Sequence, residues 1–255
     1  MAEIKKNDRA KSMSDKMDGK FIAEENVLIG FLDLCGTVAT YEKLDLRQQV
    51  ERISHVVSQA WAELSNSFGD DHRSLYVHMF ADSIVIAQRS KEKPEDCLNR
   101  LVHYLLTLQF KMLKYDPPTL CRGMLRKGRY YGILFQHETK IDDVSMNFSL
   151  VGGPTIVEMD RELKGLPAGV YIDRSLAPEY KDSSKLVQVD AAQLDFVKPP
   201  ESFLSFEEIW ENHDLDQWVE EMIEASERNE YFISKIKPWA DAVAGKSALI
   251  RRSSS

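Results

Sequence analysis

Two hydrophobic patterns alternate along this chain: short continuous apolar runs, and longer stretches with an apolar residue at every third or fourth position. Residues 27–32 form a continuous apolar run, which is typical of a buried strand. Residues 75–80 and 83–88 are rich in β-formers and are separated by only two residues, which predicts a hairpin. These segments would supply the first strands of a sheet.

Helical periodicity is clearest over residues 43–67, where apolar side chains recur at three- and four-residue steps and so share one side of a helix. They belong to Leu46, Val50, Ile53, Val57, Trp61 and Leu64. Proline suits the first helical turn and stops a helix elsewhere. A second helix is therefore expected from Pro94 to the Asp-Pro-Pro sequence at 116–118. A third is expected from Pro154 to about residue 164. We expect the apolar side of each helix to face the core.

The remaining segments complete the expected order of elements. Residues 120–126 read as a strand followed by a turn at Gly128, residues 149–154 as a loop leading into a helix, and residues 170–172 as a further short strand. The resulting order β-α-β-β-α-β-α-β predicts an α+β domain, with a mainly antiparallel, ferredoxin-like sheet and helices on one face.

The charge pattern divides the chain into three parts. Residues 1–20 are polar without periodicity, which indicates a mobile N-terminal segment. Residues 21–198 would form the main domain. After Pro199 and Pro200 the composition changes, and residues 199–255 contain three of the four tryptophans. We expect a helical C-terminal extension that packs on the main domain or on a second subunit.

Composition narrows the choice of partners. The 255 residues include 33 Lys and Arg against 41 Asp and Glu, a net charge of −8. This charge argues against nucleic acid or an anionic membrane as partner, because both attract positive surfaces. No apolar run reaches the roughly 18 residues of a membrane span, and no secretory signal is apparent. Cys35, Cys97 and Cys121 lack metal-type spacing. We expect a cytoplasmic protein with free thiols.

Two aspartates are the strongest candidates for chemistry. Asp33 ends the first apolar run and Asp82 lies at the tip of the expected hairpin. Each residue alone has a simpler reading, as a helix cap and as a turn residue. If the first strand pairs beside the hairpin, the two carboxylates come together. They could then hold two divalent ions against a triphosphate.

Several segments, in this order, resemble the sequence signatures of class III nucleotidyl cyclases. They are Phe-Leu-Asp-Leu-Cys-Gly-Thr at 31–37, the strand pair around Ala81 and Asp82, Arg-Gly-Met-Leu-Arg-Lys-Gly at 122–128, Gly-Pro-Thr-Ile-Val-Glu-Met-Asp-Arg at 153–161 and Gly-Val-Tyr-Ile-Asp at 169–173. The resemblance extends over about residues 25–195 and implies that residues 21–198 are a nucleotidyl cyclase catalytic domain.

The resemblance implies roles for individual residues. Asp33 and Asp82 would bind two Mn²⁺ or Mg²⁺ ions, assisted by the backbone carbonyl of Leu34. Arg161 falls at the position of the transition-state arginine; a solvated helix residue is the alternative for it. The β- and γ-phosphates would be bound by the backbone amides of Cys35, Gly36, Thr37 and Val38.

Departures from the family pattern concern the base. On this alignment the ribose-orienting asparagine is replaced by Val157, the base-reading lysine by His78 and the purine-selecting aspartate by Leu150, or by Ser149 after a one-residue shift. Tyr41 lies where the family pocket receives the base and would favour a single-ring base, unless it is simply a half-exposed helix aromatic. Loss of the purine-selecting groups together with retention of both metal carboxylates indicates a different base.

This combination is most similar to the bacterial pyrimidine cyclases of Pycsar antiphage defence. That resemblance implies conversion of UTP to 3′,5′-cyclic UMP and diphosphate by a homodimer with its active sites at the interface, and a downstream effector activated by the product. Conversion of CTP to cyclic CMP stays open, as does a purine cyclase with unusual base contacts. A non-catalytic, nucleotide-binding module that signals through its Trp-rich extension is the alternative of a different class.

Overall fold

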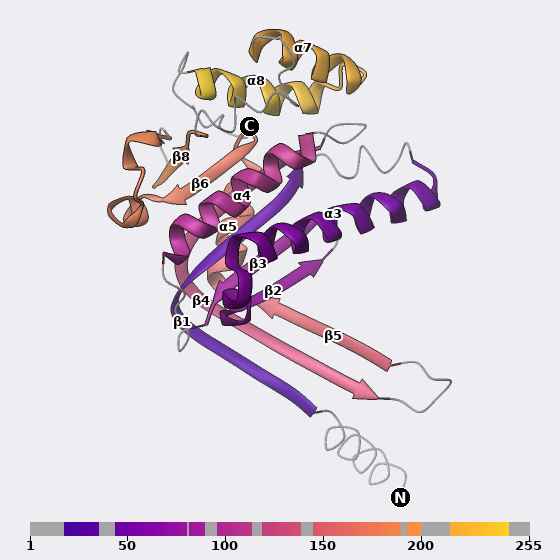
Figure 1. Ribbon diagram of the computed structural model, residues 1–255, viewed down its shortest axis with the longest axis vertical. Helices are drawn as coiled ribbons and strands as arrows, with labels where there is room; N and C mark the ends of the chain where they lie inside the picture. The colour runs from indigo at the N-terminus through magenta and orange to yellow at the C-terminus, as the bar shows by residue number, and fades with distance from the viewer. Residues whose placement is uncertain are drawn as a thin grey trace, which may run out of the picture.

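The computed structural model describes residues 18–35, 44–80, 82–89, 96–113, 119–138, 145–189, 193–199 and 215–244 (Figure 1). Its centre is an eight-stranded sheet in the order β2-β3-β1-β4-β6-β8-β7, with β5 paired to β4. The strands are β1 Asp18–Cys35, β2 Leu75–Phe80, β3 Ser83–Gln88, β4 Leu120–Glu138, β5 Ser145–Gly152, β6 Gly169–Asp173, β7 Leu186–Gln188 and β8 Leu194–Val197. Only β4 and β6 pair in parallel within this sheet. The predicted α+β fold with a mainly antiparallel sheet is confirmed.

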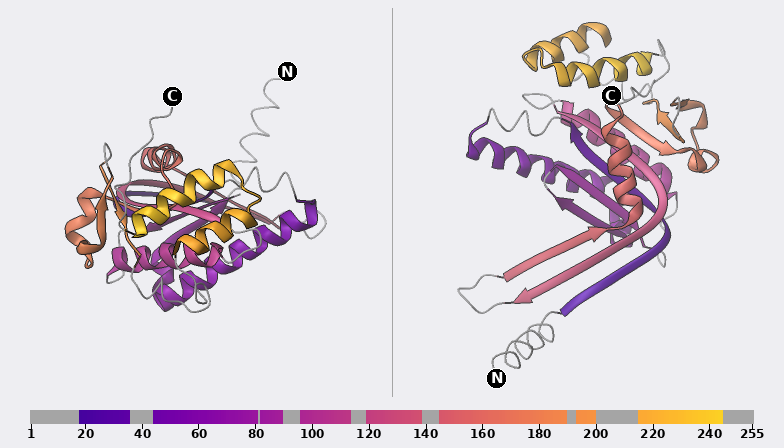
Figure 2. Two further views of the ribbon diagram at one scale, coloured as in Figure 1. Left: turned by 90° about the horizontal axis from the view of Figure 1, so that it is seen from above. Right: turned by 180° about the vertical axis from the view of Figure 1, so that it is seen from behind.

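The helices cover both faces of the sheet, so the prediction that they lie on one face is wrong, because α5 packs on the face opposite α4. They are α3 Leu46–Phe68, α4 Cys97–Leu113, α5 Pro154–Lys164, α7 Leu215–Ala225 and α8 Glu230–Ala244, with 3₁₀ turns at Gly69–Ser74, Arg174–Glu179 and Ser183–Lys185. A Cβ added at Gly123 would meet Leu105 of α4 at 3.2 Å, and one at Gly128 would meet Thr155 of α5 at 2.2 Å. Since odd and even residues of a strand point to opposite faces, α5 lies across the sheet from α4. Figure 2 shows the same layering, with α5 opposite α3 and α4.

Strand β4 is longer than the sequence indicated. It runs without interruption through the position where we expected a turn, Gly128, and pairs with β1 from Asp18↔Gln136 to Cys35↔Leu120. The turn prediction is wrong because Gly128 makes room for Thr155 instead of bending the chain. The expected loop at 149–152 is likewise part of β5. Strand β1 begins a few residues before the expected start of order, and residues 1–17 lie outside the described residues.

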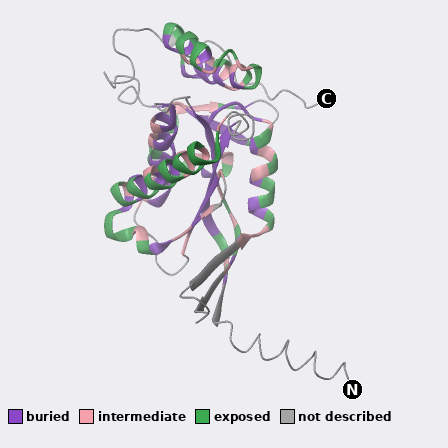
Figure 3. Cartoon of the chain, turned by 90° about the vertical axis from the view of Figure 1, so that its right-hand side faces the viewer, coloured by how far each residue is buried: buried purple, intermediate pink, exposed green. Residues whose placement is uncertain are grey.

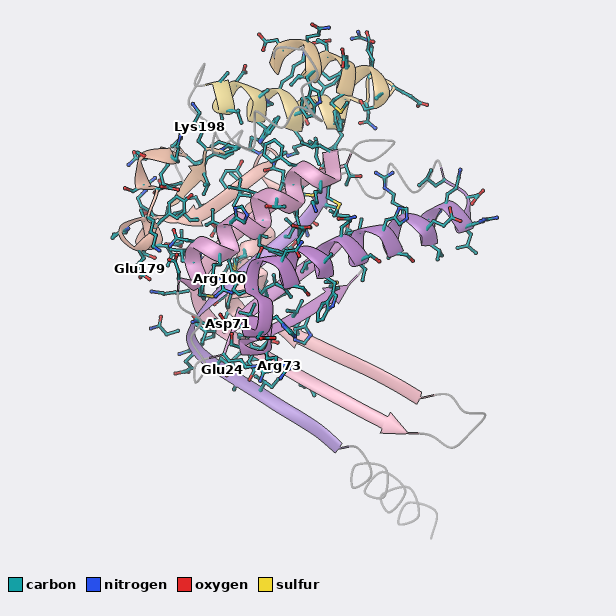
Figure 4. All side chains as sticks on the ribbon, in the orientation of Figure 1. Glu24, Asp71, Arg73, Arg100, Glu179 and Lys198 are labelled. Atoms are coloured by element: carbon teal, nitrogen blue, oxygen red, sulfur yellow. The ribbon has the colours of Figure 1, made fainter. Side chains whose placement is uncertain are left out.

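Of the six apolar positions of α3 that were expected to face the core, Leu64 is buried as predicted, but four are exposed. Val56, Ala60 and Leu64 are buried, whereas Leu46 is 77% and Trp61 51% exposed. The N-terminal part of this helix extends past α4 (Figure 1), and Figure 3 shows exposed positions along it. A capping box, in which Asp45 accepts from the backbone N–H of Gln48, starts this helix. The second predicted helix is confirmed as α4, which Arg100 links to Asp71 at 2.7 Å (Figure 4).

The last two described helices pack on the rest of the fold. Trp239 of α8 is fully buried, with ring centroids 6.0 Å from Phe110 of α4 and 6.1 Å from Trp218 of α7. The backbone N–H of Ala168 donates to the carbonyl of Lys235 at 3.4 Å. Residues 200–214 and 245–255 lie outside the described residues, and the division of the chain at Pro199 stays a prediction. In the described part, no helix combines the length and apolar character needed to cross a membrane.

Candidate functional site

The structure brings Asp33 and Asp82 together at one end of the sheet. Asp33 faces Ser83 in the β1–β3 ladder, and the Ser83 hydroxyl lies 3.4 Å from Asp33 Oδ1. One residue further on, the backbone N–H of Leu34 donates to the carbonyl of Asp82 at 3.0 Å. This bond holds the hairpin tip against the end of β1. The aspartates at the end of β1 and at the tip of the β2–β3 hairpin therefore lie at the same end of the sheet.

A buried arginine completes this cluster. Arg122 lies opposite Asp33 on β4, and its Nη2 contacts Asp33 Oδ2 at 2.5 Å. Its Nη1 donates to the carbonyl of Leu163 at 3.0 Å. Burial raises the pKa of Asp33, and the charge of Arg122 opposes that rise. The pair is thus a buried ion pair in which the Arg122 guanidinium favours the ionised form of Asp33.

Sequence reasoning placed Arg122 inside a motif but gave it no role. A charged residue within an otherwise apolar strand was the available signal, because a buried guanidinium needs an acidic partner. Identifying Asp33 as that partner required the register between β1 and β4, which joins residues 89 positions apart. The hydrophobic pattern of the sequence does not specify which residues of two such distant strands face each other.

The carboxylate oxygens at this end of the sheet suit a hard divalent cation that a nucleotide also binds. The described residues contain no group of three or more His, Cys, Asp or Glu side chains that could hold a metal by themselves. Mg²⁺ and Mn²⁺ need no such group when substrate phosphates and water supply the remaining ligands. Asp33 and Asp82 are the two carboxylates placed to contribute.

The predicted phosphate-binding segment is only partly described. Cys35 ends β1 and is buried, which raises the pKa of its thiol to about 12. It is therefore protonated at neutral pH and unsuited to act as a nucleophile. Gly36, Thr37, Val38 and Tyr41 lie outside the described residues, so their roles stay predictions.

His78 is buried within the sheet rather than open to a ligand. Its side chain is on the same face as Asp33, because both align with alternate residues of β3. Its Nε2 shares a hydrogen bond with the Tyr130 hydroxyl of β4, and the Tyr130 ring stacks on Tyr76 at 5.4 Å. Burial lowers the pKa of His78. Burial therefore favours the neutral form of the imidazole.

The candidate residues of α5 lie on its exposed side. Ile156, Met159 and Leu163 face the sheet, whereas Val157 is 55% exposed and Arg161, one turn later, is also exposed. Arg161 is therefore not directed toward the sheet of its own chain. Ser149 and Leu150 belong to β5 by their backbone, and their side chains are outside the described part.

Comparison with known proteins connects this arrangement to one kind of domain. No protein-family model and no curated protein matches the sequence. Among solved structures, the guanylyl cyclase domain of the RhoGC fusion protein from Blastocladiella emersonii is similar with a TM-score of 0.52 and 12% identity, over 70% of this chain and 95% of that one. The guanylate cyclase domain of RhGC from Catenaria anguillulae, in complex with GTP, gives 0.50 and 14%, over 65% and 86%.

A rhodopsin-guanylyl cyclase core with converted specificity, in complex with ATPαS, also has a TM-score of 0.50 at 14% identity, over 66% of this chain and 87% of that one. The chain thus has the fold of these nucleotide cyclase domains. The comparison covers nearly all of each cyclase domain, and about a third of this chain has no counterpart in them.

Proposed function

We propose that this protein is a nucleotide cyclase that converts UTP to 3′,5′-cyclic UMP and diphosphate. The observation that carries the proposal is the acidic pair, Asp33 and Asp82, joined across two strand ends in a fold shared with cyclase domains. The sequence motifs around these residues resemble the class III signatures at the same positions. The resemblance to Pycsar cyclases supports a role of the product as a signal in antiphage defence.

In the proposed reaction the ribose 3′-oxygen attacks the α-phosphorus and diphosphate leaves. Mn²⁺ or Mg²⁺, two per site and held by Asp33 and Asp82 with the Leu34 carbonyl, would lower the pKa of the 3′-hydroxyl and neutralise developing charge. Burial raises the pKa of Asp33, and the ion pair with Arg122 opposes that rise and so favours the carboxylate form that binds a cation. The backbone amides of residues 35–38 would bind the phosphates.

A homodimer would complete the site. Arg161 is exposed on the side of α5 that faces away from its own sheet, as a residue serving a second protomer must be. In the dimer that the resemblance implies, Arg161 of one protomer would stabilise charge on the phosphate held by the other.

Replacement of the family's base-reading lysine by His78 supports a pyrimidine over a purine substrate. His78 is buried and bonded to Tyr130, so the ammonium that reads a purine in the family has no counterpart at this position. Tyr41 would further reduce the space for a base. These features are compatible with both UTP and CTP, and the family resemblance favours UTP.

One observation favours a second candidate function. Val157 exposes an apolar side chain where the family has the asparagine that orients the ribose. An active enzyme would need another group for that contact. A cyclase-like module that binds nucleotide without turnover is therefore the alternative.

Product analysis separates these functions. We would incubate the purified chain with UTP, CTP, ATP or GTP and Mn²⁺, and identify products by mass. Cyclic UMP is expected. Cyclic CMP alone would support the cytidylate alternative, and cyclic AMP or GMP would contradict the assignment of His78 and Tyr41. Absence of any product from a folded dimer would favour the binding module.

A further inference from the structure

The helices α7 and α8 lie across the end of the sheet where β1 ends (Figures 1 and 2). The strand pairing explains why the end of β1 and the start of β6 lie at the same end of the sheet. The C-terminal end of β1 pairs with the start of β4, and the start of β4 pairs in parallel with the start of β6. The turn from α5 into β6 therefore lies beside Arg122, and α8 is bonded to that same turn through Ala168.

Lys235 of α8 approaches this cluster from above. Its Nζ donates to the carbonyl of Leu166 at 3.0 Å, three residues beyond the Leu163 carbonyl that accepts from Arg122 at 3.0 Å. An ammonium and a guanidinium thus contact one short turn. Lys235 is half-buried, and burial followed by the charge of Arg122 lowers its pKa.

Tyr231 stands one helical turn before Lys235. The Lys235 Nζ lies 5.5 Å from the centre of its ring. Burial raises the pKa of the Tyr231 phenol, and the charge of Arg122 opposes that rise. Because the Lys235 Nζ is also bonded to the Leu166 carbonyl, the Tyr231 ring lies beside the turn between α5 and β6. Its hydroxyl can donate a hydrogen bond to an anion.

Charges of both signs surround Asp33, and they include the carboxylates of Asp82 and Asp160. The cations of this cluster are Arg122 on β4, Lys235 on α8 and Lys164 at the end of α5, which interacts electrostatically with Asp33. Lys164 pairs with Asp160 at 2.8 Å. Within the described part of the chain, no carboxylate lies at ion-pair distance from Lys235. Arg122 is already paired with Asp33, so Lys235 is the cation for which an anionic ligand would supply the countercharge.

We infer that the α7–α8 extension completes the phosphate end of the active site, with Lys235 and the Tyr231 hydroxyl binding the diphosphate part of the nucleotide. This inference rests on the proposed function of the Asp33–Asp82 edge. Phosphate oxygens suit this place because they can accept from a lysine, a tyrosine and an arginine at once. The extension is then a part of the substrate site rather than a separate module.

Direct binding of inorganic diphosphate tests this inference without turnover. We would titrate the full chain with diphosphate and Mn²⁺ by calorimetry, and compare Lys235→Met with Lys237→Met. Lys237 is exposed on the same helix, near Glu220 at 3.4 Å, and serves as the matched control. Lys235→Met should weaken diphosphate binding at least about tenfold, the loss of one charge-assisted hydrogen bond, whereas Lys237→Met should leave it unchanged.

A second variant protects the test against misfolding. Tyr231→Phe keeps the ring and should weaken diphosphate binding a few-fold at an unchanged melting temperature. If both Lys235→Met and Tyr231→Phe bind diphosphate as the wild type does, or if the wild type itself does not bind it, the inference is overturned. If Lys235 controls diphosphate binding but no cyclic nucleotide forms, the inference stands and the proposed cyclase function fails.

Discussion

At the scale of single residues, Asp33 and Asp82 differ in what their loss would do. The Asp33 carboxylate neutralises Arg122, whose side chain is 5% exposed, so its removal leaves a buried unpaired charge. Such a loss costs about 3 to 5 kcal/mol of folding stability. Asp82 is half-buried, and its backbone carbonyl, which a substitution retains, makes the bond to Leu34. Asp82 is therefore the cleaner position for testing catalysis.

We expect Asp82→Asn to lower cyclic nucleotide formation at least about 100-fold, because the amide is a poor ligand for a hard cation. Its free energy of unfolding in urea should stay within about 0.5 kcal/mol of the wild type. Asp33→Asn should lose both activity and stability. Asp70→Asn, at an exposed aspartate, is the control and should change neither. Full activity in Asp82→Asn would contradict its role as a metal ligand.

The buried His78 predicts a pH-dependent contribution to stability. Burial lowers its pKa in the folded state, so below about pH 6.5 the unfolded chain binds more protons than the folded one. Stability from this residue is complete near neutral pH and falls with decreasing pH, by at most about 1.4 kcal/mol per pH unit.

Urea unfolding at pH 7 and pH 5 measures this contribution. The wild type should lose more stability between the two pH values than His78→Gln does, while His55→Gln, at an exposed histidine, should behave as the wild type. An equal loss in the wild type and in His78→Gln would show that the imidazole is not protected from protonation.

How far these residues could be predicted depended on the range of their contacts. Asp33 and Asp82 could be paired in advance because a strand and the hairpin that follows it tend to be neighbours in a sheet. The partners of His78 and Asp33 could not, since Tyr130 and Arg122 are 52 and 89 positions away. Such contacts depend on strand register, which the apolar pattern of a doubly covered sheet specifies weakly.

At the scale of elements, the hydrophobic periodicity predicted the positions of strands and helices in the sequence well. It predicted less well how long a strand is and which side of a helix is buried. The hairpin of β2 and β3 and the helices α4 and α5 were predicted close to their observed bounds. The length of β4 was not, because β1 on one side and β5 on the other extend its ladder past Gly128. The buried side of α3 was also misassigned, since a helix that extends past its neighbours can leave apolar side chains exposed.

Two substitutions on α3 test which of the apolar positions expected to face the core are in fact buried. Leu64 is 1% exposed, so Leu64→Ala should destabilise the fold by about 2 to 5 kcal/mol through lost burial and the cavity left behind. Trp61, which is 51% exposed, should cost much less when changed to alanine, about 0.5 kcal/mol or below. Urea unfolding of both variants gives the comparison, and a larger cost at Trp61 would mean that its side of the helix is buried after all.

At the scale of the whole molecule, the proposed site needs parts that one chain cannot bring together. Asp33 and Asp82 lie at the sheet edge, whereas Arg161 is exposed on the outer side of α5. If catalysis uses all three, Arg161 must act on a nucleotide held by a second copy of the chain. The dimer would then have two equivalent sites, each built from both protomers.

Mixing two inactive variants distinguishes this arrangement from a site within one chain. Asp82→Asn and Arg161→Ala should each lose activity alone. After the two proteins are mixed, unfolded together and refolded, about half of the dimers are mixed, and each mixed dimer has one intact site and one doubly altered site. About a quarter of the wild-type activity should therefore return. Because no single chain in the mixture has both residues, recovery requires exchange between protomers. Failure to recover activity, with size-exclusion chromatography showing intact dimers, would mean that Asp82 and Arg161 act within the same protomer.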